Sequence, residues 1–212
     1  MSKFILFDLD GTLTDSGEGI INCATLALEH FGLPVPDRTA MRVFVGPPLD
    51  ETFVKFGVPK DRANEAITVF RSRYTTIGKF ENFPYPGIPE MLKKLKSNGH
   101  RLFVVTSKPE VMAVEILEKF ELSQYFEQIC GATLDGSRSK KEDVISYLLE
   151  KTGSSESAVM VGDTSFDVTG AAAHGIRAIG VAWGYGKVQD MVDAGAVAVA
   201  STVDELFALL NT

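Results

Sequence analysis

The sequence predicts an α/β fold in which a doubly wound parallel sheet carries an inserted all-helical module. Two patterns along the 212 residues predict this fold. Short apolar runs alternate with amphipathic helical patterns, and this alternation is typical of a parallel sheet covered by helices on both faces. Near the N-terminus the alternation stops for roughly 70 residues that carry helical patterns alone, which indicates an insertion.

Short runs rich in apolar and β-branched residues are the expected strands. The first, residues 3–9, is a largely apolar run that ends in Asp and Gly, as is typical of a strand buried on both faces of a parallel sheet. The later strands are expected at residues 101–106, 128–131, 158–161, 176–181 and 196–200.

Helical patterns lie between and after these strands. In each pattern apolar residues recur three and four positions apart, so they share one face of a helix that can pack against the sheet. Gly99 ends the first pattern. The four sets are Ile88, Met91, Leu92 and Leu95; Met112, Ile116, Leu117 and Phe120; Val144, Ile145, Leu148 and Leu149; and Val203, Leu206, Leu209 and Leu210.

The insertion is expected to span residues 14–83. Two amphipathic patterns within it end in glycine, at Gly32 and at Gly78, as helices often do. Clusters of Pro and Gly between and after these patterns indicate turns. We therefore expect an α/β core made of residues 1–13 and 84–212, with a helical cap inserted after the first strand.

Composition and charge exclude several classes of protein. Lys and Arg number 21 against 28 Asp and Glu, so the formal net charge is -7, whereas a nucleic-acid-binding protein needs a basic face. No apolar run approaches the roughly 18 residues of a membrane span, and the first run is too short for a signal peptide. Cys23 and Cys130 lie far apart in the sequence, so we expect a cytoplasmic protein with reduced thiols.

Two acidic pairs follow expected strands. Asp8 and Asp10 end the first strand and point to the same side of it, at the carboxyl edge where open α/β sheets bind ligands. Asp163 and Asp167 follow the strand at 158–161, and their spacing places them on one face of a helix start. Close carboxylates repel each other unless a cation lies between them. Mg²⁺ prefers such oxygen ligands, often together with a substrate phosphate, so the sequence predicts Mg²⁺ as the cofactor.

Hydroxyl and lysine side chains between the acidic pairs suit a phosphate group. Thr106 and Ser107 follow a strand at the start of a helical pattern, where hydroxyls and backbone N–H groups can donate to phosphate oxygens. Lys140 and Lys141 precede the next helical pattern, and a lysine there can neutralise a phosphoryl group or an aspartate nucleophile. The expected partner is a small phosphorylated metabolite, with no nucleic acid and no membrane.

These motifs, in this order, resemble those of the haloacid dehalogenase superfamily of aspartate-nucleophile phosphohydrolases. They are Asp-Leu-Asp-Gly-Thr-Leu at 8–13, Thr-Ser at 106–107, a lysine at 140 or 141, and Gly-Asp at 162–163 followed by Asp167. The resemblance covers essentially the whole chain and is greatest to the phosphoglycolate phosphatase-like and bacterial 5′-nucleotidase group. It implies a Rossmann-like core with an inserted cap. It also implies hydrolysis of a phosphomonoester, with phosphoglycolate or a nucleoside 5′-monophosphate as the expected substrate.

The resemblance implies a role for each acidic residue. Asp8 attacks phosphorus and becomes a transient aspartyl phosphate. Asp10 protonates the leaving group and then deprotonates the water that hydrolyses the intermediate. Mg²⁺ is held by the side chains of Asp8 and Asp163 and by the backbone carbonyl of Asp10. Asp167 either ligates Mg²⁺ through water or supports the lysine of the third motif.

Binding of the phosphate is likewise implied by the resemblance. The motif lysine orients Asp8 and offsets charge in the transition state. No proline follows either candidate lysine, so the choice depends on the distance to the next helical pattern. That distance favours Lys141 and leaves Lys140 open. The implied substrate-binding residues are Gly11, Thr106, Ser107 and Lys141.

Two other functions stay open. A sugar phosphomutase of the same superfamily is disfavoured because its cap typically supplies a histidine after the first motif, and residues 16–20 contain none. A non-enzymatic phospho-aspartate receiver has a similar acidic cluster but no helical insertion after its first strand. The sequence determines neither the substrate nor the oligomeric state. Candidates for substrate selection or for the edge of the site are Glu18, Arg42, Phe44, Gly46-Pro47-Pro48, Arg138 and Trp183-Gly184-Tyr185-Gly186.

Overall fold

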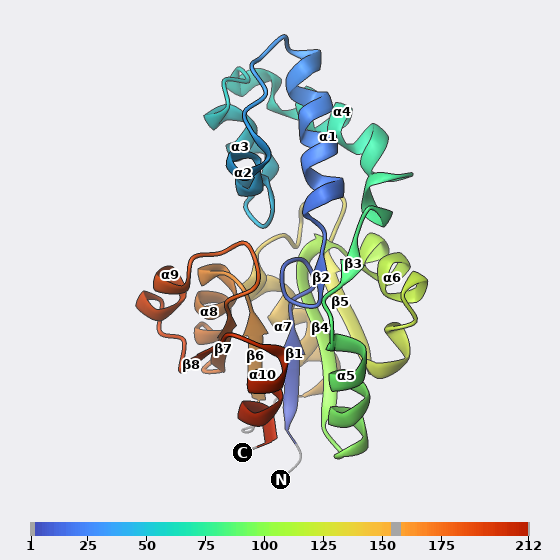
Figure 1. Cartoon of the computed structure of the whole chain (residues 1–212), viewed down its shortest axis with the longest axis vertical. Coiled ribbons are helices and arrows are strands. Elements are labelled where there is room, and N and C mark those ends of the chain that lie inside the picture. The colour runs from blue at the N-terminus through green and yellow to red at the C-terminus, as the bar shows by residue number, and fades with distance from the viewer. Residues whose placement is uncertain (1–2, 154–157, 212) are drawn as a thin grey trace. The chain divides into compact units, whose positions relative to one another are not determined.

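The chain folds as two compact units, shown in the ribbon of Figure 1. The computed structural model describes residues 3–153 and 158–211. Unit 1 comprises residues 1–14 and 84–212, and unit 2 comprises residues 15–83. None of the helices in the described ranges is both long and apolar enough to cross a membrane.

The described part of unit 1 contains a six-stranded parallel sheet. Phe7 in the centre of the sheet lies opposite Val104 on one side and Val161 on the other. The chain winds outward from the central strand in one direction and then in the other, so the strand order reverses there, which is where doubly wound folds bind ligands. In spatial order the strands are β5 (Gln128–Ala132), β4 (Arg101–Pro109), β1 (Phe4–Phe7), β6 (Ala158–Gly162), β7 (Arg177–Val181) and β8 (Ala198–Ala200).

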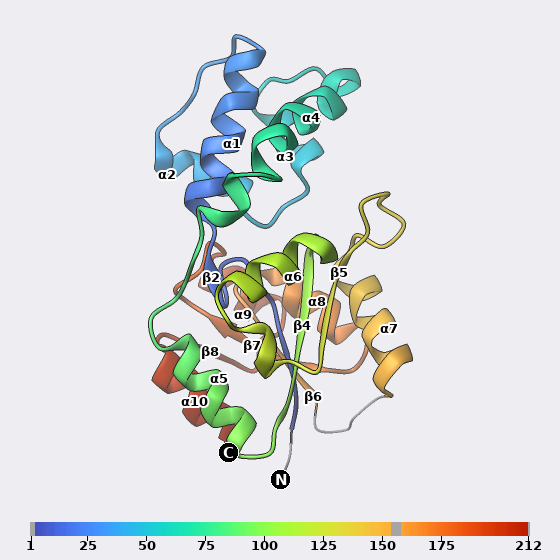
Figure 2. The ribbon, with the colours of Figure 1, turned by 90° about the vertical axis from the view of Figure 1, so that its right-hand side faces the viewer.

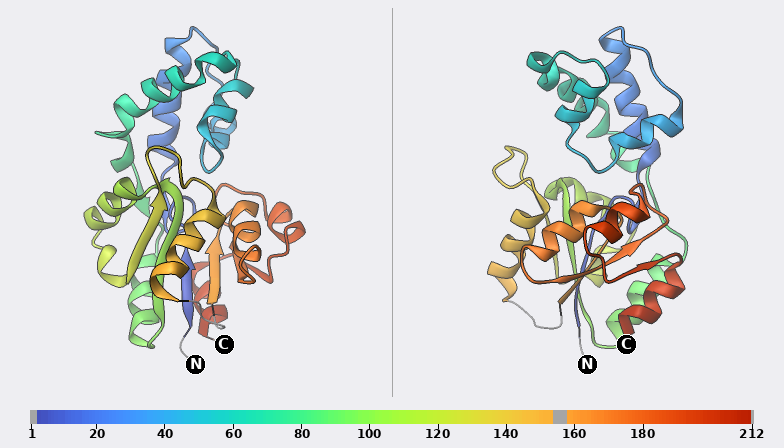
Figure 3. Two further views of the ribbon diagram at one scale, coloured as in Figure 1. Left: turned by 180° about the vertical axis from the view of Figure 1, so that it is seen from behind. Right: turned by 90° about the vertical axis from the view of Figure 1, so that its left-hand side faces the viewer.

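Helices cover both faces of this sheet and confirm the predicted doubly wound α/β fold. On one face, α5 and α10 lie side by side (Figure 2) and share a hydrophobic core with α6. On the other face, α7 lies in front of the sheet in the left view of Figure 3 and shares a second core with α8 and α9. The helices are α5 (Ile88–Ser97), α6 (Glu110–Lys119), α7 (Lys141–Thr152), α8 (Ser165–Ala172), α9 (Val188–Asp193) and α10 (Val203–Asn211), with a 3₁₀ helix η4 (Ser123–Tyr125).

The alternation of side chains in β1 divides the two cores. Ile5 and Phe7 point into the core with α5, α6 and α10, whereas Phe4 and Leu6 point into the core with α7, α8 and α9. Successive side chains of a strand face opposite sides of the sheet, so a continuous apolar run fills both cores. The strand is therefore fixed from both faces immediately before Asp8.

Unit 2 is helical between its two ends. Its core is aromatic: the ring of Phe44 lies 5.0 Å from that of Phe53 and 4.7 Å from that of Phe56, measured between centroids. Close helix packing at Gly19 leaves no space for a β-carbon against the carbonyl oxygen of Gly78. The helices are α1 (Gly17–His30), α2 (Arg38–Met41), α3 (Leu49–Lys55) and α4 (Ala63–Tyr74), with 3₁₀ helices η1 (Arg42–Phe44), η2 (Lys60–Arg62) and η3 (Gly78–Phe80).

Two short strands lie where the chain passes between the units. β2 (Thr14–Asp15) and β3 (Phe83–Pro84) pair in a two-stranded sheet. The expectation of no strand between residues 14 and 83 is therefore wrong at both ends, because strands of two residues carry no readable alternation. The structure also extends β4 past its predicted end at residue 106, to Pro109.

Candidate active site

The acidic residues lie at the point where the strand order reverses. Asp8 follows β1 and Asp163 follows β6, the two strands on either side of this point. The backbone N–H of Asp8 donates to the carbonyl of Val161 at 2.9 Å, which fixes the two strand ends against each other. Two carboxylates from distant parts of the sequence therefore reach the same edge of the sheet.

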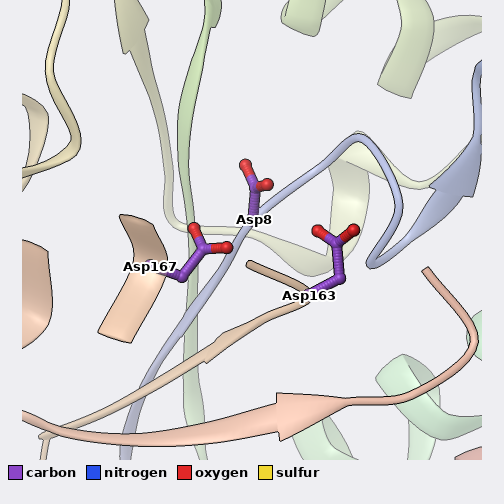
Figure 4. A group of neighbouring side chains, drawn as sticks. All are labelled: Asp8, Asp163 and Asp167. Carbon is purple, nitrogen blue, oxygen red and sulfur yellow. The ribbon is translucent and has the colours of Figure 1, made fainter. Parts of the chain in front are cut away.

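Three carboxylates meet at this edge. Figure 4 shows the side chains of Asp8, Asp163 and Asp167 grouped together, the first two directly after β1 and β6 and the third on α8. One oxygen of each lies within 4.8 Å of the others, and all three residues are buried. A β-carbon at Gly162 would collide with the Asp167 side chain, so the glycine of the Gly-Asp motif is needed for this close approach.

Lys141 supplies the positive charge of the cluster. Its Nζ lies 2.8 Å from Oδ1 of Asp8 and 2.8 Å from Oδ1 of Asp167, and it donates to the carbonyl of Val105 at 3.0 Å. The Lys141 side chain is 4% exposed, whereas that of Lys140 is 74% exposed. Of the two lysines that the sequence left open, Lys141 reaches the cluster and Lys140 does not.

Asp167 also caps the start of α8. Its Oδ2 accepts hydrogen bonds from the backbone N–H of Thr164 at 3.0 Å and from the Thr164 hydroxyl at 2.8 Å, which forms the capping box of the helix. Its Oδ1 pairs with Lys141. Asp167 therefore caps α8 with one oxygen and contacts Lys141 with the other.

Burial and charge repulsion shift the pKa values of the cluster. Burial, followed by the charges of Asp167 and Asp8, raises the pKa of Asp163 from 3.8 to about 8. Burial also raises the pKa of Asp8, to about 6, although Lys141 opposes this shift. Burial acts to lower the pKa of Lys141, but Asp167 and Asp8 outweigh it and raise the pKa above its usual value. One lysine therefore does not balance the three carboxylates.

The chemistry of these donors fits a divalent cation. The cluster presents three buried carboxylates at close range, and one buried lysine pairs with two of them. Mg²⁺ prefers oxygen ligands and is usually held by one or two carboxylates. A divalent ion would return Asp8 and Asp163 to their charged forms.

Asp163 is oriented through both of its oxygens. The hydroxyl of Thr12 donates to Oδ1 at 3.3 Å, and the backbone N–H of Tyr185 donates to Oδ2 at 2.8 Å. The Trp183–Gly186 loop reaches this position because Trp183 Nε1 donates to the carbonyl of Thr12 at 3.1 Å and because Gly184 packs against Asp163. The loop that the sequence suggested for the edge of the site thus holds an acidic side chain directly.

Asp10 has a partner that the sequence reasoning missed. Lys108 Nζ donates to Oδ2 of Asp10 at 2.7 Å, and the side chains are 5% and 14% exposed. Lys108 stands two residues after Thr106, but the register of β4 against β5 shifts between Val105 and Pro109, so simple alternation does not place its side chain. The strand was expected to end at residue 106, before Lys108.

The predicted phosphate-binding residues are distributed along two strand ends. Thr106 is buried in β4, and its hydroxyl accepts a hydrogen bond from the backbone N–H of Lys108 at 3.2 Å. Ser107, the next residue, is exposed. Gly11 adopts a positive φ of 81° and has no room for a β-carbon beside Asp163, so this turn requires glycine.

Among the candidates for substrate selection, the prediction for Phe44 is wrong. It is 1% exposed and packs inside the aromatic core of unit 2, so it does not present its ring to a ligand. Arg138 is tied to Glu110 at 3.0 Å and lies over the Tyr147 ring at 3.6 Å, which gives it a structural role. Glu18 and Arg42 are exposed on unit 2.

The fold and the site together define a class of protein. A doubly wound sheet that carries buried carboxylates and a lysine where its strand order reverses is typical of phosphoryl-transfer enzymes that use Mg²⁺. Comparisons with known proteins narrow this class to one family.

The haloacid dehalogenase-like hydrolase family matches residues 5–181. A 5′-nucleotidase of Pseudomonas aeruginosa is 42% identical over 88% of this chain and 86% of its own length. A tyrosine-protein kinase, PtkA, of Mycobacterium tuberculosis is 45% identical over 96% of this chain and 71% of its own length. Proteins named phosphoglycolate phosphatase match at lower identity, 34% for that of Aquifex aeolicus.

A solved structure described as a predicted phosphatase from Clostridium acetobutylicum covers 100% of this chain and 99% of its own chain. It has a TM-score of 0.94 and 41% sequence identity. The chain belongs to the haloacid dehalogenase-like hydrolases. The family and the enzyme class that the sequence predicted, a phosphatase of this family, are confirmed.

Proposed function

We propose that the protein is a Mg²⁺-dependent phosphatase that hydrolyses a small phosphomonoester through an aspartyl phosphate on Asp8. The observation that carries the proposal is the contact between Asp8 and Lys141, 2.8 Å apart and buried at the sheet edge. A carboxylate held by a lysine beside a cation site is suited to attack phosphorus. Family membership favours an enzyme over a non-enzymatic receiver.

The reaction has two steps. In the first, an oxygen of Asp8 bonds to phosphorus while the bond to the leaving oxygen breaks, and Asp10 gives a proton to that oxygen. In the second, a water molecule attacks phosphorus, Asp10 takes its proton, and the bond to Asp8 breaks to release inorganic phosphate. Lys141 holds Asp8 in place through both steps and offsets the negative charge.

Cation and hydroxyl groups would stabilise the phosphoryl group. Mg²⁺, held by Asp8, Asp163 and the backbone carbonyl of Asp10, would supply the charge that lets an anionic carboxylate approach an anionic phosphate. The Thr106 hydroxyl already accepts a hydrogen bond from the Lys108 N–H, so its proton is available to donate to a phosphoryl oxygen. Gly11 and Ser107 complete the proposed phosphate contacts.

The proposed substrates are nucleoside 5′-monophosphates and phosphoglycolate. The names of the relatives support both, at 42% identity for the 5′-nucleotidase and 34% for the phosphoglycolate phosphatase. Both are small alkyl phosphates, whose leaving group needs the proton that Asp10 would give.

Phosphate release tests the proposal. Purified protein is assayed with and without Mg²⁺ on nucleoside monophosphates, phosphoglycolate, sugar phosphates, pyrophosphate and an aryl phosphate. We expect Mg²⁺-dependent turnover concentrated on one substrate class, and Asp8→Asn should lose at least about 10³-fold in kcat because the nucleophile is gone. The matched control is Asp15→Asn, an exposed carboxylate outside the cluster. Turnover by Asp8→Asn at the wild-type rate would contradict the proposal.

A phosphotransferase is the second candidate, because relatives 45% identical to this chain are named tyrosine-protein kinase PtkA. A tyrosine hydroxyl would then receive the phosphoryl group in place of water. Radiolabelled ATP offered together with a tyrosine-containing protein separates the two functions. Label on tyrosine supports transfer, and label in inorganic phosphate supports hydrolysis. A sugar phosphate isomerised without release would indicate a mutase.

A further inference from the structure

Lys108, the partner of Asp10, has no role in the reaction described so far. Lys108 is a buried lysine in the extended end of β4. Its Nζ lies 2.7 Å from Oδ2 of Asp10, which is the residue proposed to exchange protons with the leaving group and with water. Burying a lysine is costly unless it is paired, so this pairing fixes both side chains.

The two oxygens of Asp10 have different surroundings. Oδ2 accepts the hydrogen bond from Lys108. Oδ1 is buried and has no hydrogen-bond partner among the described residues. A buried carboxylate oxygen without a partner is unusual in a folded protein and calls for an explanation. A leaving oxygen or a water molecule in the reaction would supply the missing partner.

We propose that Lys108 is a positioning residue that gives the two oxygens of Asp10 different roles: Oδ2 accepts its hydrogen bond, and Oδ1 exchanges the proton. An ammonium group only donates, so Oδ2 remains an acceptor whether or not the carboxyl is protonated, and the exchangeable proton sits on Oδ1. In the first step the Oδ1–H bond breaks, its proton goes to the leaving oxygen, and the P–O bond to that oxygen breaks. In the second step Oδ1 takes a proton from the attacking water. This inference rests on the proposed function.

The geometry of β4 makes Lys108 suited to this task. Its backbone N–H donates to the hydroxyl of Thr106 at 3.2 Å, so the residue proposed to hold the phosphoryl group and the residue that holds Asp10 are fixed to each other. Thr106 and Lys108 are both buried, with exposed Ser107 between them. This link limits how far a phosphate bound at Thr106 can move relative to Asp10.

The test compares leaving groups that need a proton with leaving groups that do not. Lys108→Met keeps the length of the side chain and removes the donor. Against an alkyl phosphate we expect its kcat to fall about 10²-fold with KM nearly unchanged, because a misplaced catalytic group costs about that much. Against p-nitrophenyl phosphate the loss should be much smaller, because nitrophenolate leaves without a proton. Lys108→Gln, which keeps an N–H donor, should recover part of the alkyl activity.

A double-mutant cycle shows whether Lys108 acts through Asp10. In an Asp10→Asn background, Lys108→Met should change kcat by less than about twofold, because the two effects are not independent. The control is Lys140→Met, an exposed lysine outside the cluster, which should behave as wild type. Circular dichroism and the melting temperature of each variant verify that it is folded, and Lys108→Gln replaces Lys108→Met in the cycle if the latter unfolds.

Two outcomes would overturn the inference while leaving the phosphatase intact. One is an equal loss on alkyl and aryl phosphates, and the other is a loss that adds fully to that of Asp10→Asn. Absence of turnover by the wild-type protein on every phosphomonoester would instead overturn the proposed function, and this inference would fall with it.

Discussion

The protonation of Asp163 depends on burial and on the neighbouring carboxylates. Asp163 lies within 4.8 Å of two other carboxylates in a buried site. Its pKa is raised from 3.8 to about 8, by burial first and by Asp167 and Asp8 next. In the absence of a cation the folded protein therefore binds a proton that the unfolded chain releases at lower pH. Between pH 3.8 and about 8 the native state holds more protons than the unfolded state, so the free energy of unfolding falls as pH rises through this window.

Replacement of Asp163 by asparagine should remove this cost. In EDTA at pH 8 we expect Asp163→Asn to melt several degrees above the wild-type protein, and at pH 4 the two should melt together. Mg²⁺ should raise the melting temperature of the wild type at pH 8 and leave Asp163→Asn nearly unchanged. Thermal unfolding followed by circular dichroism across this pH range measures both effects.

The exposed aspartate Asp135 provides a control for this prediction. It lies outside the cluster, so Asp135→Asn should keep the wild-type response to Mg²⁺. A wild-type protein whose stability in EDTA is constant between pH 4 and pH 8 would contradict the electrostatic account of the cluster.

At the scale of single residues, sequence reasoning worked where a strand end and a motif coincide. It placed Asp8, Asp163 and Asp167 at one edge of the sheet, and the structure brings their oxygens within 4.8 Å of one another. It missed Lys108 because this partner of Asp10 lies on another strand, and the spacing of residues along the sequence does not reveal contacts between strands. It wrongly offered Phe44 because exposure of an aromatic residue depends on tertiary packing.

At the scale of elements, the Trp183–Gly186 loop fixes the side chain of Asp163 by a hydrogen bond and by close packing. A β-carbon on Gly184 would lie 2.5 Å from the carbonyl oxygen of Gly11 and would also meet the Asp163 side chain. A backbone atom cannot move aside as a flexible side chain can. Substitution of Gly184 must therefore displace the loop or Asp163.

We expect Gly184→Ala to weaken Mg²⁺ binding about 10- to 100-fold, the usual effect of losing a group that orients a metal ligand. Isothermal titration calorimetry with Mg²⁺ alone measures this without any substrate. Lys187→Ala, an exposed residue directly after the loop, should bind Mg²⁺ as the wild type does. An unchanged affinity in Gly184→Ala would show that the loop does not orient Asp163.

The strands differ in how well the sequence predicts them. The apolar run before Asp8 was readable as a strand because a central strand fills cores on both faces of the sheet. The end of β4 was not readable, because Ser107, Lys108 and Pro109 are polar or turn-forming residues that stay extended only through tertiary contacts. The pairing of β2 with β3 was equally hidden, since each has two residues.

At the scale of the whole molecule, the two units have separate cores. Phe44 belongs to the core of unit 2, whereas the carboxylate cluster lies entirely in unit 1. We expect Phe44→Ala to destabilise unit 2 by about 3–5 kcal/mol, as loss of a buried aromatic side chain does. Mg²⁺ should then stabilise the unfolding transition of unit 1 alone.

Differential scanning calorimetry with and without Mg²⁺ separates these transitions. The comparison variant is Leu6→Ala, which removes a buried side chain from the sheet of unit 1 and should lower the transition that Mg²⁺ shifts. Loss of Mg²⁺ binding in folded Phe44→Ala would contradict the independence of the two cores.

The pairing of β2 with β3 has a consequence for how such enzymes diversify. The chain leaves the sheet unit through one of these strands and returns through the other, so the two junctions of the inserted segment are neighbours. Recombination that exchanges residues between these junctions would leave the register of the large sheet and the positions of Asp8 and Asp163 unchanged. A single genetic event can therefore replace the inserted segment while the carboxylate cluster of the sheet unit is retained.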